Sequence, residues 1–559
     1  MKNIYSVSLF FFCISFSLLS QEPVIQELDN IHHEVEEDPY VYVDRNLMPK
    51  GPAYSARGDF WFTTQVNVDG NGDDIIGDAA NEPSLAVDPT NNNRIVVGWR
   101  QFDNISSNFR QAGYGHSDNG GFSFVFPGPI NPGVFRSDPV LDFDGEGNLY
   151  YNSLRGNFAC DVYKIEDGSF TWEGPFPAFG GDKQWMRIDR TNGIGSRNNY
   201  SNWNESFTTC SPGYFTRSTD GSETFETCIE IDESPRWGTL AVDANGDLYV
   251  VGISNNGTGF VLIKSTTAKD PNEEFVTWDS VTVVDLDGDL GIGDPVNPQG
   301  LLGQVWVDVD LNNDNVYVLA TVDRLSNGDP ADVMFAKSTD GGVTFAPPVR
   351  LNTDPGTDAR QWFGTMSVAP NGRIDVVWLD TRDATGNFES VLYYIYSGDE
   401  GESWSLNRPI SESFDPGIGY PQQQKMGDYF DMKSDDQYAH LAWANTINGG
   451  QDVYYTRIVP NLLAVDDLAI QAFDAKISPN PFNESTWIEF SIHDETRTSI
   501  EIFDLMGRKV RNLLDEGISG HRRIEWDGTD NSGAKLNSGL YFITINSGGK
   551  KATMKAVLR

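Results

Sequence analysis

The chain has 559 residues, of which 55 are glycine and 12% are aromatic, and its formal net charge is -41 at pH 7. A surface of this charge repels nucleic acid and anionic membranes, so we exclude both as partners, and any anionic ligand requires a local cluster of Arg or Lys. The many glycines, aromatic residues and short Val/Ile/Tyr/Trp runs predict an all-β chain with room for more than one domain.

The N-terminus has the pattern of a secretory signal. Residues 1–21 begin with Lys2 close to the start and continue as an apolar run. This layout predicts a cleaved signal peptide, and no later stretch is apolar enough to predict a transmembrane segment. Residues 22–57 are acidic and rich in turn-forming residues. They predict an N-terminal arm without a core of its own.

Two features of the exported chain leave alternatives open. Cleavage of the signal leaves Cys160, Cys210 and Cys228, and three cysteines cannot all pair. One disulfide and one free thiol suit an exported protein, but the sequence does not assign the pair. Asp69, Asn71 and Asp73 alternate along a turn and could hold Ca²⁺, although a solvated acidic turn is the simpler interpretation.

An octapeptide of the form Ser-x-Asp-x-Gly-x-Thr-aromatic recurs along the chain. Clear copies span 338–345 and 397–404, near copies span 117–124 and 218–225, and weaker ones end at Trp172 and Trp278. Asp and Ser can bond neighbouring N–H groups, Gly can adopt a positive φ, and the aromatic residue can fold beneath. Each copy therefore predicts a tight turn between antiparallel strands. The pattern resembles the Asp box, or BNR repeat, of sialidase-like β-propellers, which implies that fold and outer turns far from the active site.

Seven apolar strands recur at a step that suits one four-stranded propeller blade with variable loops. They end at Asp88, Asp144, Asp189, Asp243, Asp310, Ala369 and Lys433. The seventh unit has no box and no outer strand, which would leave an unpaired edge. We expect the isolated strand 60–66 to fill that edge and close the ring. The predicted seven-bladed propeller spans residues 58–460.

The composition changes after a linker at 461–476. Residues 477–559 contain short strands separated by Gly/Asn turns, which predict a small antiparallel β-sandwich. Residues 478–482, Ser-Pro-Asn-Pro-Phe, followed by these strands, resemble the Ig-like C-terminal sorting domain of the Bacteroidetes type IX secretion system. The resemblance implies that the type IX machinery is a partner and that the protein passes through the periplasm to the medium or the outer-membrane surface. A carbohydrate-binding sandwich is the alternative.

Propeller geometry places the residues ahead of each innermost strand, and those after each second strand, at one mouth of the central funnel. Arg, Trp and carboxylates occupy these positions. Arg pairs bidentately with a carboxylate, Trp stacks on sugar rings and paired carboxyl groups transfer protons, so the mixture predicts an acidic glycan as ligand. The residues that we predict to bind substrate are Arg100, Lys183, Trp185, Arg236, Arg360, Trp362 and Arg382. Buried ion pairs that brace the blades are the structural alternative.

The resemblance to retaining sialidases implies three Arg residues on the substrate carboxylate, a Tyr nucleophile beside a Glu, and an Asp acid/base. By position, Tyr429 is the candidate nucleophile, Glu82 its base, and Asp138 or Asp182 the acid. The chain departs from that family in two ways. It has Asn-Glu-Pro at 81–83 in place of the usual Arg-Ile-Pro, and seven predicted blades rather than six.

The leading interpretation is a secreted or surface-bound, monomeric, exo-sialidase-like glycoside hydrolase that acts on acidic sugars, requires no cofactor and has no catalytic metal. A non-catalytic propeller that binds glycan or protein is one alternative. A lyase acting on uronic-acid polysaccharides is the other. None of the six histidines falls at a predicted funnel position, which disfavours a His-dependent lyase, but Tyr429 with Lys183 could still abstract a proton.

Overall fold

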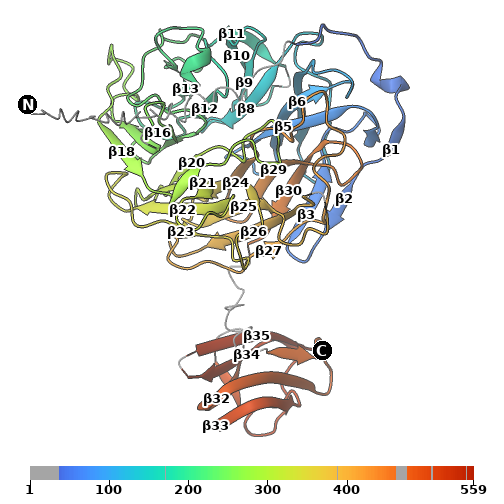
Figure 1. The fold of residues 1–559 in the computed structure, drawn as a ribbon. Helices are drawn as coiled ribbons and strands as arrows, with labels where there is room; N and C mark the ends of the chain where they lie inside the picture. Colours follow the sequence, from blue (N-terminus) through green and yellow to red (C-terminus); the bar gives the residue numbers. More distant parts are fainter. Residues whose placement is uncertain are drawn as a thin grey trace, which may run out of the picture.

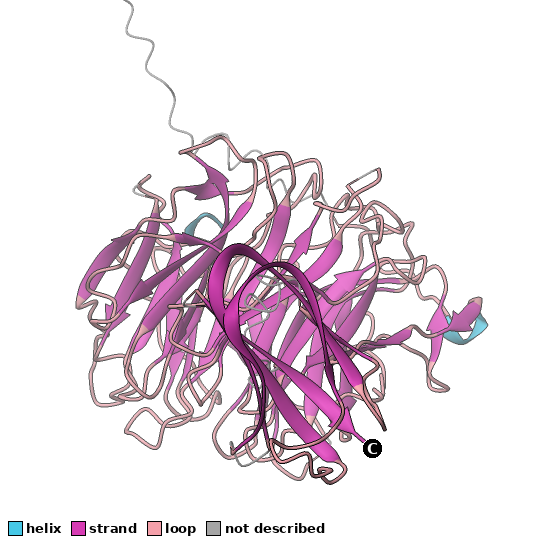
Figure 2. Cartoon of the chain, turned by 90° about the horizontal axis from the view of Figure 1, so that it is seen from below, coloured by secondary structure: helices cyan, strands magenta, loops and turns pink. Residues whose placement is uncertain are grey.

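The computed structural model describes residues 37–169, 171–257, 259–386, 388–460, 475–504, 508–548 and 550–559. Within these ranges nearly all regular structure is β-strand, and the short 3-10 helices η1 (Arg45–Leu47) and η2 (Glu205–Phe207) are the exceptions (Figure 2). The predicted all-β class is confirmed. The predicted signal peptide at 1–21 and most of the linker at 461–476 lie outside the described residues.

Seven small sheets stand around a common centre (Figure 1). The first four, each given from its innermost strand outward, are β5 (Ala79–Val87), β6 (Ile95–Phe102) and β7 (Gln111–Ser117); β8 (Ser137–Phe143), β9 (Leu149–Leu154), β10 (Cys160–Ile165) and β11 (Glu173–Pro177); β12 (Trp185–Ile188), β13 (Asn199–Asn202) and β14 (Phe215–Ser218); and β15 (Leu240–Val242), β16 (Leu248–Ile253), β17 (Phe260–Ser265) and β18 (Ser280–Val284). We number these sheets as blades 1 to 4.

Blades 5 to 7 complete the ring. They are β20 (Trp306–Val309), β21 (Val316–Arg324), β22 (Asp332–Ser338) and β23 (Val349–Arg350), with β19 (Gly288–Leu290) also paired to β21; β24 (Gln361–Val368), β25 (Ile374–Asp380), β26 (Val391–Ser397) and β27 (Arg408–Pro409); and β28 (Asp431–Ser434), β29 (Ala439–Asn445), β30 (Asp452–Ile458), β3 (Trp61–Gln65) and β2 (Ser55–Arg57). Consecutive innermost strands contact one another, and β28 contacts β5. The seven-bladed propeller predicted from the repeat is therefore confirmed.

The N-terminal strand β3 closes the ring in the predicted way. It pairs antiparallel with β30, and Thr63 lies opposite Thr456 with their hydroxyl oxygens 2.8 Å apart. Val66, just beyond β3, is fully buried. Part of the predicted N-terminal arm joins the same sheet, because β2 pairs with β3, while β1 (Lys50–Pro52) pairs with β4 (Asp73–Ile75). The last blade is thus built from both ends of the propeller.

Side-chain hydrogen bonds join every blade to the next at the innermost strands. The seven contacts are Ser84 Oγ accepting from Leu141 N, Asp142 from Ile188 N, Thr239 Oγ1 from Val307 N, Asp308 from Val368 N, Ser367 Oγ from Ser434 N, Asp431 from Leu85 N, and Arg187 Nε donating to Leu240 O. Donor and acceptor lie 2.8–3.0 Å apart in all seven, and the shortest contact joins Val368 N to Asp308. We call these contacts the inter-blade latches. They bond backbone groups that neighbouring innermost strands leave outside their own sheets.

The octapeptides form the turns that the sequence predicts. At 338–345, Ser338 Oγ accepts from Gly342 N at 2.9 Å, and the Asp340 carboxylate accepts from both N and Oγ1 of Thr344 at 2.9 and 2.6 Å. The terminal aromatic residue does more than fold beneath its own turn. The Trp404 ring of blade 6 lies 5.0 Å from that of Phe335 in blade 5, so these turns also bind neighbouring blades together.

The structure assigns the cysteines. Cys210 and Cys228 form a disulfide in blade 3, and Cys160 is a buried free thiol. One disulfide and one free thiol is the arrangement that the odd count left open. The bond closes a loop with a sequence separation of 18. A loop of that size stabilises the folded state by about 3 kcal/mol in the chain-entropy model.

The C-terminal module is a separate antiparallel sheet with its own core (Figure 1). Its strands are β31 (Lys476–Ser478), β32 (Thr486–Phe503), β33 (Lys509–Trp526), β34 (Gly539–Ser547) and β35 (Lys550–Leu558). The long strands β32 and β33 pair along most of their length and bend around fully buried residues such as Phe490 and Trp526. The module therefore folds around a small core that contains no propeller residue.

The latches predict a specific loss of stability. Asp431 is fully buried and accepts from Leu85 N at 2.9 Å and Ser84 Oγ at 2.8 Å, so Asp431→Ala leaves both donors without their acceptor. We expect a loss of about 3 kcal/mol in the free energy of unfolding, measured by urea denaturation. The matched change Ser367→Ala removes a neutral latch and should cost about 1 kcal/mol. Equal losses in the two variants would contradict a special role for the charged latch.

Ring closure predicts the outcome of truncation. A chain that starts at residue 67 lacks β2 and β3, so the β30 edge loses its partner. We expect this chain to aggregate, because an unpaired edge recruits other strands. A chain that starts at residue 37 keeps both strands and serves as the control. Size-exclusion chromatography with light scattering measures the result, and a monomeric, cooperatively unfolding short chain would disprove the closure.

Candidate functional site

In each blade one residue in the first half of the innermost strand, or just ahead of that strand, adopts a left-handed backbone conformation. The seven residues, with φ between 46° and 128°, are Glu82, Asp138, Lys183, Trp237, Gly303, Phe363 and Gly427. At Gly427 a Cβ atom would lie 2.6 Å from Glu82 Cγ, so this position requires glycine. The strand register also shifts beside Glu82, Asp138 and Phe363. Bulges of this kind redirect a side chain, and at Glu82 and Asp138 the redirected carboxyl groups both lie close to Lys183.

Blades 1, 2, 3 and 7 supply charged residues at this end of the channel. Four carboxyl groups and three cations gather there, and we call them the buried charge cluster: Glu82, Asp138, Asp182, Asp428, Arg100, Lys183 and Lys425. Six of the seven side chains have a residue exposure of 3% or less, and Lys425 has 6%. Lys183 is central, with Nζ 2.7 Å from Asp428 and 3.2 Å from Asp138. Arg100 lies 3.3 Å from Glu82.

Electrostatics single out Glu82 within the cluster. Complete burial raises the pKa of Glu82 to about 8, against the opposing effect of nearby Arg100. Burial also acts on Asp138, but Lys183, Arg100 and the hydrogen bond from Ser137 together outweigh it and hold the pKa of Asp138 well below its usual range. With Glu82 protonated, three carboxylates face three cations. The buried charge cluster is then neutral, which is the favourable state for charges removed from water.

Beneath this cluster the channel is filled by aromatic rings. Trp185 packs edge-on against Tyr429 and against Trp306, with ring centroids 5.3 Å apart in both pairs. The Tyr429 hydroxyl donates to the Pro139 carbonyl oxygen at 3.0 Å. Burial raises the pKa of Tyr429 well above its usual value, and Glu82 adds to the rise. The candidate nucleophile is therefore buried, protonated and hydrogen-bonded to the backbone.

The structure brings together seven of the eleven residues singled out from the sequence. Glu82, Arg100, Asp138, Asp182, Lys183, Trp185 and Tyr429 line the channel. The other four lie in blades 4 and 6. Arg236 stacks over the Trp237 ring at 4.5 Å, and Trp362 donates to Ser390 Oγ at 3.1 Å inside the core. Nothing in this geometry assigns a catalytic role to any of the eleven.

Arg360 and Arg382 instead line an open cavity of about 660 Å³ on blade 6. Arg360 Nε donates to both oxygens of Asp294, at 2.6 and 2.8 Å, and its guanidinium lies 5.2 Å from the Phe388 ring centroid. Arg382 donates to Asp380 at 2.6 Å. The cavity is bordered by the loop before β24 and the loop after β25, the two places where the sequence analysis expected ligand-binding residues.

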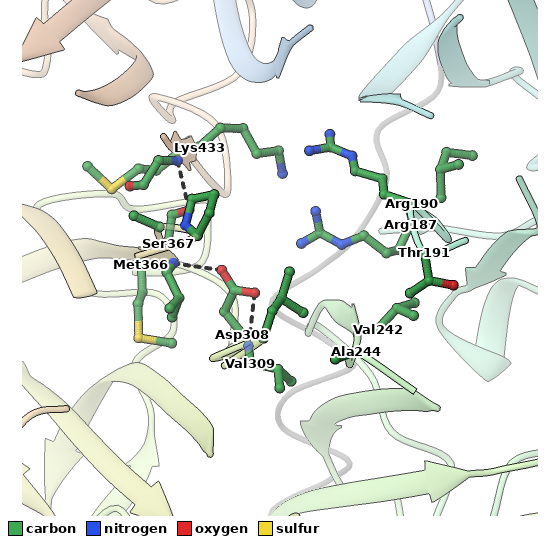
Figure 3. A pocket seen from close by; sticks show the side chains of 17 residues that line it. Arg187, Arg190, Thr191, Val242, Ala244, Asp308, Val309, Met366, Ser367 and Lys433 are labelled. Carbon is green, nitrogen blue, oxygen red and sulfur yellow. Dashed lines mark hydrogen bonds between the residues drawn. The ribbon is translucent and has the colours of Figure 1, made fainter. Parts of the chain in front are cut away.

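Sequence reasoning missed a second cavity at the opposite end of the channel, where the innermost strands end. Arg187, Arg190 and Lys433 project into it (Figure 3). Alternation along β12 contained a signal, because Trp185 and Arg187 are two positions apart and therefore share one side of the strand. The sequence prediction considered only the residues near the starts of the innermost strands, whereas Arg187, Arg190 and Lys433 lie near their ends.

The predicted calcium turn is engaged in other contacts. Asp69 forms an ion pair with Lys50 and accepts from Asn71 N at 2.7 Å and Asp73 N at 2.9 Å. These hydrogen bonds and the ion pair with Lys50 outweigh burial and lower the pKa of Asp69 to about 2. Across the described ranges no group of three or more His, Cys, Asp or Glu side chains is arranged to hold a metal ion. Calcium binding at Asp69, Asn71 and Asp73 stays a prediction.

Comparison with solved structures finds propellers of low similarity. A protein of unknown function from Dyadobacter fermentans DSM 18053 is 14% identical, with 69% of this chain and 98% of that chain covered and a TM-score of 0.39. Trypanosoma rangeli sialidase is 10% identical, with 90% and 89% covered and a TM-score of 0.37. PorZ, a surface component of the type IX secretion system of Porphyromonas gingivalis, is 13% identical, with 83% and 64% covered and a TM-score of 0.26. Similarity at this level does not extend to activity or substrate.

Comparison with protein families identifies the C-terminal module. Residues 476–559 match the secretion system C-terminal sorting domain. None of the curated proteins compared with the chain matches it. No helix in the described ranges is both long and apolar enough to cross a membrane. The chain therefore combines a seven-bladed propeller with a sorting domain that directs it to the medium or to the outer-membrane surface.

Proposed function

We propose that this protein is a surface or secreted propeller that binds an acidic glycan without cleaving it. The observation that carries the proposal is the closure of the buried charge cluster. Its carboxyl groups bond to its own cations, and Glu82 and Asp428 have no exposed surface. A glycosidase needs its acid and its nucleophile within reach of the sugar ring.

The left-handed backbone at Glu82, Asp138 and Lys183 supports the same conclusion. Strained residues of this kind often mark active sites. Here the same conformation recurs at the corresponding place in blades 4 to 7, at Trp237 and Phe363 among others, where the side chains cannot carry acid/base chemistry. The strain therefore belongs to the architecture of the ring, and it gives no separate support for catalysis.

The blade 6 cavity supplies a site of suitable chemistry for a sugar acid. Arg360 and Arg382 provide guanidinium groups, and Phe388 is 37% exposed and offers a ring face. Arg pairs with carboxylates through two parallel hydrogen bonds, and an aromatic face stacks on a pyranose ring. Arg360 already forms an ion pair with Asp294, so a glycan carboxylate would have to share Arg360 with Asp294 or displace Asp294 from it.

A sialidase-like hydrolase is the second candidate, and one observation favours it. The pKa of Glu82 is raised to about 8 while that of Asp138 is lowered. Two carboxyl groups with pKa values moved apart are typical of an acid and a base in one active site. In that case a movement of the loops above the cluster would have to admit the substrate to Tyr429.

Binding and hydrolysis are separated by one set of assays. We expect the full-length protein to bind sialyl-lactose or a uronic-acid oligosaccharide and to release neither free sialic acid nor new reducing ends or unsaturated products. Arg360→Ala should weaken binding about tenfold in isothermal titration calorimetry, because a charge-assisted hydrogen bond to the ligand is lost. Arg408→Ala, which changes an Arg on the outer strand of the same blade, is the control.

Three results would overturn the proposal. Release of product that stops in the Tyr429→Phe variant would establish the hydrolase. Binding that Arg360→Ala leaves unchanged would remove the blade 6 cavity as the site. Absence of both binding and turnover with all of these acidic glycans would exclude this ligand class.

The raised pKa of Glu82 predicts a pH-dependent stability. The folded protein keeps a proton that the unfolded chain releases above the ordinary pKa of 4.5, so stability falls as pH rises from 4.5 to about 8. The slope is at most about 1.4 kcal/mol per pH unit. Glu82→Gln carries no such proton, and we expect its urea midpoint to fall less over this range. Glu146→Gln, on the surface, is the control, and parallel curves for Glu82→Gln and the unmodified protein would contradict the assignment.

A further inference from the structure

The cavity at the strand-end mouth has a volume of about 210 Å³ and a mixed lining. We call it the basic cavity. Arg187 and Arg190 come from blade 3 and Lys433 from blade 7, so cations approach it from opposite sides (Figure 3). Val242, Val309 and Met366 form an apolar wall. The side chains of Arg187, Arg190 and Lys433 are 14%, 34% and 12% exposed, so solvent reaches all three.

Backbone contacts hold the two guanidinium groups in place. Arg187 Nε donates to Leu240 O at 3.0 Å, and Arg190 Nε donates to Phe143 O at 2.8 Å. The terminal nitrogens of Arg187 point into the gap (Figure 3). Arg187 Nη1 lies 3.7 Å from the Asp142 carboxylate, which is beyond hydrogen-bond distance. Fixed guanidinium groups lose little conformational freedom when they bind a ligand.

The carboxylates around the basic cavity accept from backbone N–H groups, and two of them also pair with its cations. Asp142 accepts from Ile188 N, Asp308 from Val368 N and Asp431 from Leu85 N, all as inter-blade latches. Arg190 does bond to Asp142, and Lys433 Nζ lies 3.3 Å from Asp431. Asp308 lines the cavity as well, and its two carboxylate oxygens accept from Val309 N and Val368 N.

Three cations line the basic cavity of a strongly acidic chain. The protein carries a formal net charge of -41, so most of its surface repels anions. Burial is the largest cause of a lowered pKa at Lys433, and the charges of Arg187 and Arg190 add to it while Asp431 and Asp142 oppose it. An anion in the gap would relieve this repulsion.

We propose that the basic cavity binds a tetrahedral oxyanion, sulfate or phosphate, either free or as an ester group of a larger ligand. A planar carboxylate presents its two oxygens to one side and is satisfied by a single guanidinium. A tetrahedral oxyanion has oxygens on all sides and can meet Arg187, Arg190 and Lys433 together. This site lies at the opposite end of the channel from the proposed glycan site and does not depend on it.

The test is calorimetric titration of the full-length protein with sodium sulfate, sodium phosphate, glucose 6-sulfate and sodium acetate, at ionic strength matched with sodium chloride. We expect sulfate or phosphate to bind, and Lys433→Gln and Arg190→Gln each to weaken binding about tenfold, because each loses a charged donor. Lys337→Gln is the control, since Lys337 lies on β22, does not line the cavity and pairs with Glu400 and Glu402. Melting temperatures identify any variant that fails to fold, and the other variant then decides.

The four titrated compounds distinguish a free anion from an ester-bearing ligand and a tetrahedral anion from a carboxylate. Binding of glucose 6-sulfate as tight as that of sulfate identifies an ester-bearing ligand, and binding of the inorganic ion alone identifies a free anion. Acetate that binds as tightly as sulfate and phosphate overturns the tetrahedral preference. Absence of binding by all sulfate and phosphate probes, or an affinity unchanged in both variants, overturns the site.

Discussion

The ring of inter-blade latches is the constraint on which the rest of this structure depends. Innermost strands of neighbouring blades run side by side around the channel without forming a shared ladder, so some of their backbone groups need other partners. Unsatisfied backbone groups in a buried channel are costly. Seven side chains meet this need, one at each junction, and Asp431 of the last blade returns to Leu85 of the first. The closing strand β3 serves the same end at the outer edge, where it pairs with β30.

The latches also determine which charged residues remain for binding. Asp142, Asp308 and Asp431 lie beside the channel, but backbone N–H groups occupy them. Arg187 Nε donates to Leu240 O, and its terminal nitrogens point into the basic cavity. A charged side chain near the axis of a propeller is therefore no sign of catalysis in itself, because the architecture has its own use for it. A side chain in this ring can bind a ligand only through donor or acceptor atoms that are not already bonded in an inter-blade latch.

Much of the fold could be predicted from the sequence, because the octapeptides and apolar strands repeat and a repeat determines topology. The repeat also predicts the place of the isolated strand at 60–66, because the seventh unit has no outer strand of its own. The site could be predicted only as a set of positions. Glu82, Asp138, Lys183 and Asp428 come from four blades, and whether they face a ligand or one another depends on distances that no local pattern contains. The pairing of Cys210 with Cys228 rather than Cys160 is likewise a matter of blade 3 geometry.

The two ends of the channel solve the problem of charge in opposite ways. At the strand-start end, Lys183 lies within 3.8 Å of four carboxyl groups, and one proton on Glu82 makes the cluster neutral. Such a cluster braces blades 1, 2, 3 and 7, and a ligand would have to displace an internal partner to enter it. At the strand-end mouth, Leu240 O and Phe143 O hold the guanidinium groups of Arg187 and Arg190. Arg190 also pairs with Asp142, whereas the terminal nitrogens of Arg187 lie beyond hydrogen-bond distance of that carboxylate. A guanidinium held by a neutral carbonyl group keeps its attraction for an anion, and the basic cavity leaves room for one beside Arg187.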